Sequence, residues 1–246
     1  MTVPQDRDAA WTQYTSARTD IAAGDPGELL GVVGLLHGLC TALTVNLAVM
    51  GVAVHLMSAG GSDGVAAASD DRCRSVEELQ FTTGEGPCLE AFAARRPVLA
   101  PDLLSETGGR WPGYASAALL SGVAAVFAFP LHVGSVAFGV LDVFSDHPGS
   151  LTAEQETLAS TYAQIATEIM LDGELTTIEG ELDPALSSAL DDRAQIHQAQ
   201  GMVVFDLGVD PAEALARMKA RAFSGDEALI DLAREIISGF NLRSDG

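Results

Sequence analysis

The sequence predicts an α+β protein in which an antiparallel sheet covered by helices is followed by a bundle of three helices. Over residues 25–172, short apolar runs bounded by turn residues alternate with helical segments, as in a sheet with helices on its faces. After residue 185, strand-like alternation stops and helical periodicity remains. The acidic segment 173–184 contains helix breakers, so we place a linker there and treat residues 1–24 as an N-terminal arm, either helical or disordered.

Local signals predict each element of the first domain. Asp25-Pro26-Gly27-Glu28 indicates a helix start, because Asp caps, Pro fits the first turn and Glu answers the cap; this helix extends to about Thr44. Apolar runs between turn clusters predict strands at 47–57, 65–68, 97–100, 123–131 and 136–144. Further helices are expected at 75–79, 88–95, 111–120 and 152–171, the last capped by Thr152 and Gln155.

Three helices are expected in residues 185–246. The first covers about residues 185–207. The second begins at Asp210-Pro211, and the third begins at the capping box Ser224-Gly-Asp-Glu227. In the second and third helices, apolar residues fall on one face: Ala214, Leu215, Met218 and Ala222, then Leu229, Leu232, Ala233 and Ile236.

The charge and the cysteines limit what the chain binds. The formal net charge of −21 over 246 residues repels polyanions at long range, so a nucleic-acid contact must come from a local patch. The cysteines Cys40, Cys73 and Cys88 lack CxxC spacing, which argues against a disulfide framework and a zinc site. We therefore expect no metal and no cofactor.

One apolar segment is long enough to span a bilayer. Residues 29–57 contain no Asp, Glu, Lys or Arg. Scattered glycines, polar residues such as Asn46, and the absence of a flanking basic cluster argue against a membrane span, and the segment divides naturally into a helix and a strand. No secretion signal opens the sequence, so we expect a cytoplasmic protein.

The residues Arg193-Ala-Gln-Ile-His-Gln-Ala-Gln-Gly-Met202 resemble the first-helix signature of ANTAR domains. The later spacings of that family are matched by Glu213-Ala214, Met218-Lys219, Ala222, Leu229 and Ala233, so the resemblance covers about residues 186–238. It implies a three-helix module that recognises paired RNA hairpins and prevents terminator formation. On this basis we assign RNA binding to Arg193, Gln200, Gly201, Met202 and Lys219.

The chemistry of these residues is compatible with RNA, with two departures from the family. Gly201 inside a helix costs about 1 kcal/mol relative to Ala, which indicates close approach by an RNA loop or a neighbouring helix. Gln200 can both donate to and accept from a base edge, but the family usually has Lys there. Residues 185–246 carry six basic and ten acidic side chains. The alternative function is therefore a protein-interaction or dimerisation regulator that has lost RNA binding.

The first domain resembles a GAF domain of the actinobacterial type that precedes ANTAR modules. The likeness rests on the order of five motifs: Gly84-Glu-Gly-Pro-Cys88, Arg110-Trp-Pro112, Gly122-Val123, Phe129-Pro-Leu131 and Gly139-Val-Leu141. It implies a sensor that binds a small-molecule ligand between the sheet and its helices, or that dimerises. No catalytic motif is present, so we expect no enzyme. Apolar faces on the helices at 25–44 and 152–171 predict a homodimer.

Cys88 has two interpretations. Its position at a helix N-terminus would lower the pKa of a thiol and suit redox sensing. The neighbours Leu89, Ala91 and Phe92 instead favour a small buried side chain. We expect burial and slow modification by peroxide. By similar reasoning, His37, His55 and His132 are expected to be core or surface residues rather than ligands.

Overall fold

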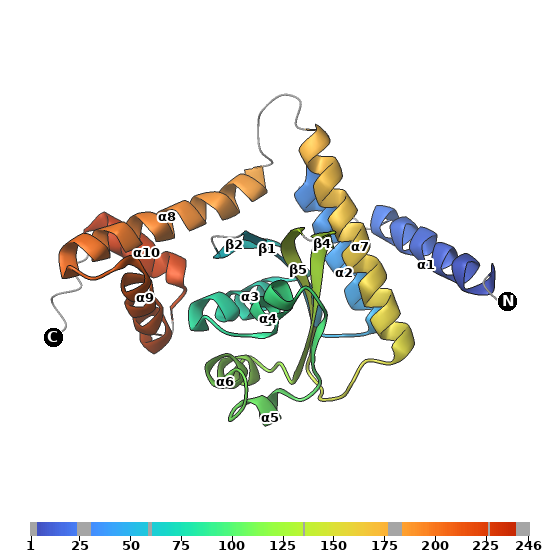
Figure 1. The fold of residues 1–246 in the computed structure, drawn as a ribbon, viewed down its shortest axis with the longest axis horizontal. Helices are drawn as coiled ribbons and strands as arrows, with labels where there is room; N and C mark the ends of the chain where they lie inside the picture. The colour runs from blue at the N-terminus through green and yellow to red at the C-terminus, as the bar shows by residue number, and fades with distance from the viewer. Residues whose placement is uncertain are drawn as a thin grey trace.

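A five-stranded antiparallel sheet forms the centre of the first domain (Figure 1). The computed structural model describes residues 4–23, 31–58, 61–134, 136–176, 184–225 and 227–239. The strands are β1 (Gly51–Ser58), β2 (Gly61–Ala68), β3 (Val98–Ala100), β4 (Ala125–Val133) and β5 (Val136–Ser145). Their order is β2-β1-β5-β4-β3, and every neighbouring pair is antiparallel. This arrangement confirms the predicted α+β class.

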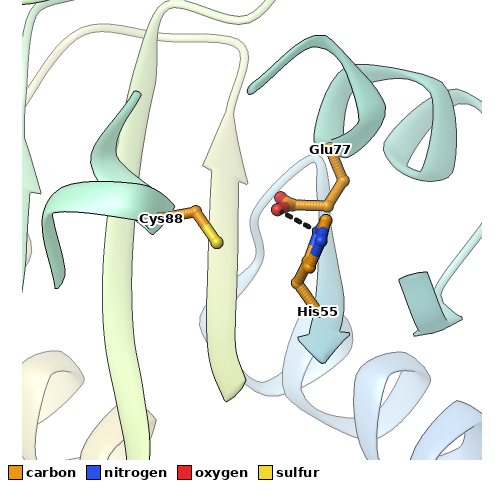
Figure 2. A group of neighbouring side chains, drawn as sticks. All are labelled: His55, Glu77 and Cys88. Atoms are coloured by element: carbon orange, nitrogen blue, oxygen red, sulfur yellow. Dashed lines mark ion pairs between the residues drawn. The ribbon is translucent and has the colours of Figure 1, made fainter. Parts of the chain in front are cut away.

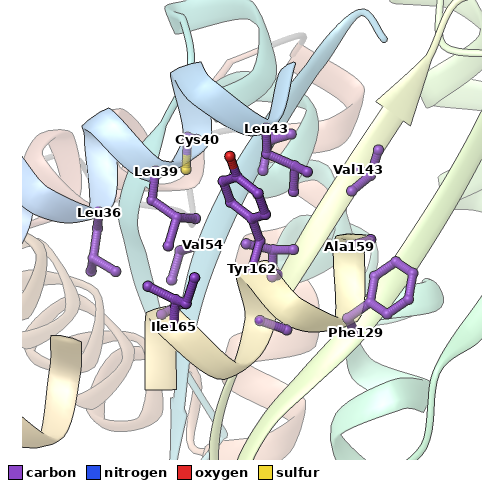
Figure 3. Packing of buried hydrophobic residues seen from close by; sticks show 14 of the residues in the cluster. Leu36, Leu39, Cys40, Leu43, Val54, Phe129, Val143, Ala159, Tyr162 and Ile165 are labelled. Carbon is purple, nitrogen blue, oxygen red and sulfur yellow. The ribbon is translucent and has the colours of Figure 1, made fainter. Parts of the chain in front are cut away.

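Two helices cover one face of the sheet, α2 (Gly31–Leu47) and α7 (Ala153–Thr176), and α1 (Pro4–Ala23) packs against both of them. Figure 3 shows Leu36, Leu39 and Leu43 of α2 facing Tyr162 and Ile165 of α7. Each fully buried leucine contributes about 1.5–3 kcal/mol, which outweighs the low helix propensity of the glycines in α2. Within the apolar segment 29–57, residues 31–47 thus form a core helix and residues 51–57 lie in a core strand. No helix in the described part of the chain could cross a membrane.

The N-terminal segment belongs to the same core. Ala17 and Ile21 of α1 are buried in the cluster that α2 and α7 share. At the start of α7, the expected capping box is present. The Thr152 N–H donates to Gln155 Oε1 at 2.9 Å, and the Gln155 N–H donates to Thr152 Oγ1 at 3.2 Å.

Four helices cover the opposite face of the sheet: α3 (Asp71–Thr83), α4 (Pro87–Ala94), α5 (Leu103–Glu106) and α6 (Pro112–Leu120). The side chains of Val76, Tyr114, Val140 and Phe144 lie in the core between these helices and the strands. Successive residues of a strand point to opposite faces, so Ala53, His55 and Met57 of β1 face this second core.

The second domain is the expected bundle of three helices: α8 (Pro184–Leu207), α9 (Pro211–Gly225) and α10 (Leu229–Ser238). Its core comprises Ile196, Ala199, Val203, Ala214, Met218, Ala222, Leu229, Leu232, Ala233 and Ile236. The bundle contacts the first domain where α8 meets the edge strand β2 and where α9 meets α3 (Figure 1).

Several predicted boundaries were wrong. The helix predicted at 75–79 covers 71–83, because Asp70 accepts the Cys73 N–H at 2.7 Å and Gly84, at φ 73°, ends the helix. The short helix α5, capped by Asp102, was not predicted. The third helix of the bundle begins at Leu229 and not at Ser224, because α9 continues to Gly225. The helix start predicted at Asp25 lies outside the described residues.

Candidate functional site

An exposed stripe on α8 carries two of the residues assigned to RNA, Gly201 and Met202, together with Phe205. Phe205 follows Gly201 by four positions and Met202 by three, so its side chain neighbours both of them on the helix surface. A Cβ atom at Gly201 would meet nothing within 4 Å, so no described part of the chain requires glycine there. Met202 is 39% exposed and Phe205 is 90% exposed. This stripe (Gly201, Met202, Phe205) therefore presents an aromatic ring and an open backbone to a partner.

Gln200 is engaged by the protein itself. Its Nε2 donates to the carbonyl oxygen of Pro211 at 2.7 Å, and its Oε1 lies 3.1 Å from Nδ1 of His197. The first contact joins the end of α8 to the start of α9. Gln200 must therefore give up this bond, or use its remaining hydrogen-bonding capacity, to contact a base edge.

Lys219 points toward the first domain and not along the α8 stripe. Its Nζ lies 4.4 Å from the ring centroid of Phe81 on α3, within the range of a cation–π contact. Beside this contact is a groove of about 650 Å³, lined from both domains by residues that include Gly84, Gly113, Leu215 and Phe223. Sequence reasoning assigned Lys219 to the same RNA surface as Gly201 and Met202, but in the structure Lys219 lies apart from the stripe on α8.

The other basic residues of the bundle are less informative. Arg217 forms an exposed ion pair with Glu213 one turn earlier on α9. Arg193 lies on α8, but its side chain is outside the described residues.

A second site lies inside the first domain, where polar side chains are buried between the sheet and α3, α4 and α6. His55 on β1 is 3% exposed, and Glu77 on α3 and Asp142 on β5 are 0% exposed. Figure 2 shows the His55 imidazole against the Glu77 carboxylate, with Nδ1 2.9 Å from Oε1, and the Cys88 thiol on the other side of that carboxylate. The period of two along each strand places His55 and Asp142 on the same face.

Gln80 connects the members of this cluster. Its Nε2 donates to Glu77 Oε2 at 3.0 Å and to Asp142 Oδ2 at 3.3 Å. Its Oε1 accepts the backbone N–H of Cys88 at 2.7 Å. One amide thus fixes both carboxylates and the first turn of α4.

The motif Gly84-Glu-Gly-Pro-Cys88 builds this corner of the cluster. Gly86 has φ 146°, and a Cβ there would lie 2.4 Å from Gln80 Oε1, so glycine is required. Pro87 occupies the first turn of α4. Glu85 accepts the N–H groups of Gly113 at 2.6 Å and Tyr114 at 3.1 Å, which caps α6.

Burial dominates the electrostatics of the cluster. It raises the pKa of Glu77 to about 7, and it raises the pKa of Asp142 well above its usual value, with the Glu77 charge as the next cause. The pKa values of the Cys88 thiol and the Tyr114 phenol are also raised, first by burial and then by the neighbouring carboxylates. Asp142 Oδ1 and the Tyr114 hydroxyl are buried and have no hydrogen-bond partner among the described residues.

The predicted burial of Cys88 is confirmed, since the residue is 1% exposed. Sequence reasoning expected His55 in the core or on the surface, and the structure places it in the core. It missed Glu77, Gln80 and Asp142, and it missed Phe205 on α8. A signal existed for Asp142, a carboxylate inside the apolar run Val140–Phe144 of a predicted strand. Glu77 and Gln80 have no such signal, because polar residues are ordinary on a helix that covers a sheet.

Comparison with known proteins agrees with this division of the chain. A GAF domain model matches residues 27–170, and an ANTAR domain model matches residues 185–237. No curated protein matches the chain in sequence. Among solved structures, the GAF domain of an Acinetobacter phosphoenolpyruvate-protein phosphotransferase is similar with a TM-score of 0.51 at 11% identity, covering 74% of this chain and all of that one.

Two further solved structures are similar at lower scores. The GAF domain of a Coxiella burnetii phosphoenolpyruvate-protein phosphotransferase has a TM-score of 0.48 at 11% identity, covering 68% of this chain and 96% of that one. A free methionine-R-sulfoxide reductase from Neisseria meningitidis has a TM-score of 0.49 at 17% identity, covering 71% of this chain and 96% of that one.

Proposed function

The chain belongs to the GAF domain family and carries an ANTAR domain after its GAF domain, and we propose that it is a cytoplasmic, signal-responsive transcription antiterminator that binds RNA hairpins. Both domains are regulatory types, and the proposal assigns no catalytic step to either. The ANTAR domain is the output and the GAF domain senses the signal. Residues 173–184 act as the linker between the two, although residues 173–176 still belong to α7 and Pro184 already begins α8.

The observation that carries the proposal is the exposed stripe on α8. Hairpin loops present unstacked bases, and proteins read such bases by stacking them on aromatic rings. Phe205 offers a ring that is 90% exposed, and Gly201 beside it leaves the helix backbone open to close approach. A base stacked on an aromatic side chain contributes about 1–3 kcal/mol, enough to offset part of the repulsion from the acidic chain.

The docking of α9 on α3 provides a way for the signal to regulate RNA binding. In this arrangement Lys219 lies over Phe81, so the basic side chain that we assign to phosphate contact is turned toward the GAF domain. A fully competent RNA surface therefore requires α9 to leave α3. We assign this docked arrangement to a restrained form and propose that the signal favours a released form, because that form alone would present Lys219 to RNA.

The test measures binding to tandem hairpin leader RNAs from the same genome by electrophoretic mobility shift at several salt concentrations. We expect Phe205→Ala to weaken binding by about 1–3 kcal/mol, or about 5- to 150-fold. Gly201→Leu should abolish binding yet stabilise α8 by about 0.5–1 kcal/mol, because the leucine enters open space and has the higher helix propensity.

Leu120→Ala is the matched control, since this leucine on α6 is 91% exposed and lies on the other domain. If Phe205→Ala and Gly201→Leu bind hairpin RNA as the parent does, the stripe is not the RNA surface. The protein-interaction regulator is then the better function, because an exposed aromatic ring with an adjacent methionine also suits a protein partner.

A further inference from the structure

Three potential metal ligands meet inside the GAF domain. The Nδ1 atom of His55, a carboxylate oxygen of Glu77 and the thiol sulfur of Cys88 all lie within 4.8 Å of one another. They come from β1, from α3 and from the first turn of α4, and Figure 2 shows their side chains converging from these elements. Each side chain is buried, so the donors face one another within the core and not solvent.

The surroundings of these donors leave polar atoms unsatisfied. Asp142 Oδ1 and the Tyr114 hydroxyl have no hydrogen-bond partner among the described residues, although both side chains are fully buried. An unpaired buried polar group costs free energy, and a buried unpaired carboxylate costs far more. The His55 imidazole can supply one positive charge to the two carboxylates of this apolar core, whereas the thiol and the phenol supply none.

We propose that this cluster is a site for a thiophilic divalent metal ion of the zinc class, ligated by His55 Nδ1, a Glu77 carboxylate oxygen and the Cys88 thiolate, with Asp142 as the fourth donor. A nitrogen, oxygen and sulfur donor set suits Zn²⁺ and Co²⁺ and excludes hard cations such as Mg²⁺. Tetrahedral zinc holds its donors roughly 3.5 Å apart, so the three donors need shift only modestly to enclose an ion.

Binding is coupled to proton release. The thiol of Cys88 gives its proton to solvent, and each carboxyl group that holds a proton in the metal-free core does the same, so that the ion replaces protons and no redox step occurs. Gln80 fits the role of a supporting residue, because its amide already holds both carboxylates and the N–H of Cys88.

The site is joined to the output helix by α3. Glu77 and Gln80 of the cluster lie within one turn of Phe81, and Phe81 contacts Lys219 of α9. An ion that repositions Glu77 thereby acts on the helix against which the ANTAR domain is docked. This consequence rests on the proposed function, whereas metal binding itself does not.

The experiment uses the full chain without RNA, so its outcome is separate from that of the RNA assay. Chelator-treated protein is titrated with Zn²⁺ and with Co²⁺. We expect one tightly held ion per chain by elemental analysis, a rise in Tm, and a thiolate-to-cobalt charge-transfer band. Cys88→Ser should remove that band, and Glu77→Gln should weaken binding at least 10-fold.

Cys40→Ser and Cys73→Ser are matched controls, since both thiols are buried elsewhere. They should leave the cobalt spectrum unchanged. The proposal is overturned if the parent protein retains no ion or shows no thiolate band. It is also overturned if Cys88→Ser, folded by circular dichroism, keeps the band. If Cys88→Ser does not fold, Asp142→Asn serves as the test in its place. Loss of this donor should weaken Co²⁺ binding at least 10-fold. An unchanged affinity for Co²⁺ would contradict the site.

Discussion

Gln80 shows how much one buried amide holds in place. Its side chain joins Glu77, Asp142 and the backbone of Cys88, and it is 1% exposed. We expect Gln80→Met, which keeps the size but removes the polar atoms, to lower the free energy of unfolding by about 2–4 kcal/mol, because it leaves buried groups unpaired. Urea unfolding measures this. Gln164→Met on the exposed face of α7 is the control, and an equal loss there would contradict the argument.

Gln200 is a second amide, with a role divided between structure and recognition. Because its Nε2 donates to the Pro211 carbonyl, Gln200→Ala should cost about 1 kcal/mol of unfolding free energy in addition to relaxing discrimination between loop sequences. Gln200→Lys should keep a donor to that carbonyl and strengthen RNA binding through the added charge. Thermal unfolding and binding to two loop sequences separate the two roles. An unchanged unfolding temperature of Gln200→Ala would argue against the structural role of Gln200.

At the scale of elements, the contact between α3 and α9 is the point where sensing and output meet. Phe81→Ala removes the ring under Lys219, an interaction of about 0.5–1 kcal/mol. Because the restrained form then loses stability relative to the released form, we expect RNA to bind about 2- to 5-fold more tightly. Lys219→Ala should have the opposite effect on RNA, weakening binding to all hairpins and flattening its salt dependence.

The control for Phe81→Ala is Phe92→Ala on α4, a partly buried ring of the first domain that packs into the second core rather than against α9. It should destabilise the GAF domain without tightening RNA binding. If Phe81→Ala leaves the affinity unchanged, or weakens it, α9 is not restrained by this contact.

Local signals predicted most elements but not their assembly. The helix starts at Thr152 and Pro112 are determined by residues close to them in the sequence, and the structure places both starts as expected. The buried cluster depends on side chains from residue 55 to residue 142, brought together by strand pairing that no local pattern encodes. The same holds for Lys219, whose contact with Phe81 depends on how two domains dock.

At the scale of the whole molecule, the apolar faces of α2 and α7 are not the free surfaces on which the homodimer was predicted. Their apolar faces pack against each other, the sheet and α1, so most of that surface is covered within one chain. The apolar side chains of α2 that stay exposed include Leu35 and Val45, which are 49% and 73% exposed. Apolar side chains on one outer helix suit a two-fold interface, in which the same patch meets its copy.

We therefore keep the homodimer as a prediction and assign its contact to the outer surface of α2. Light scattering at tens of micromolar should give twice the chain mass of 25.5 kDa. The double variant Leu35→Glu and Val45→Glu should shift the protein to monomer, because like charges would then face each other across the two-fold axis. Leu104→Glu on α5, where the leucine is 68% exposed, is the matched control and should remain dimeric. A parent protein that scatters as a 25.5 kDa species at these concentrations would exclude the dimer, and RNA binding would then have to be explained for a single copy.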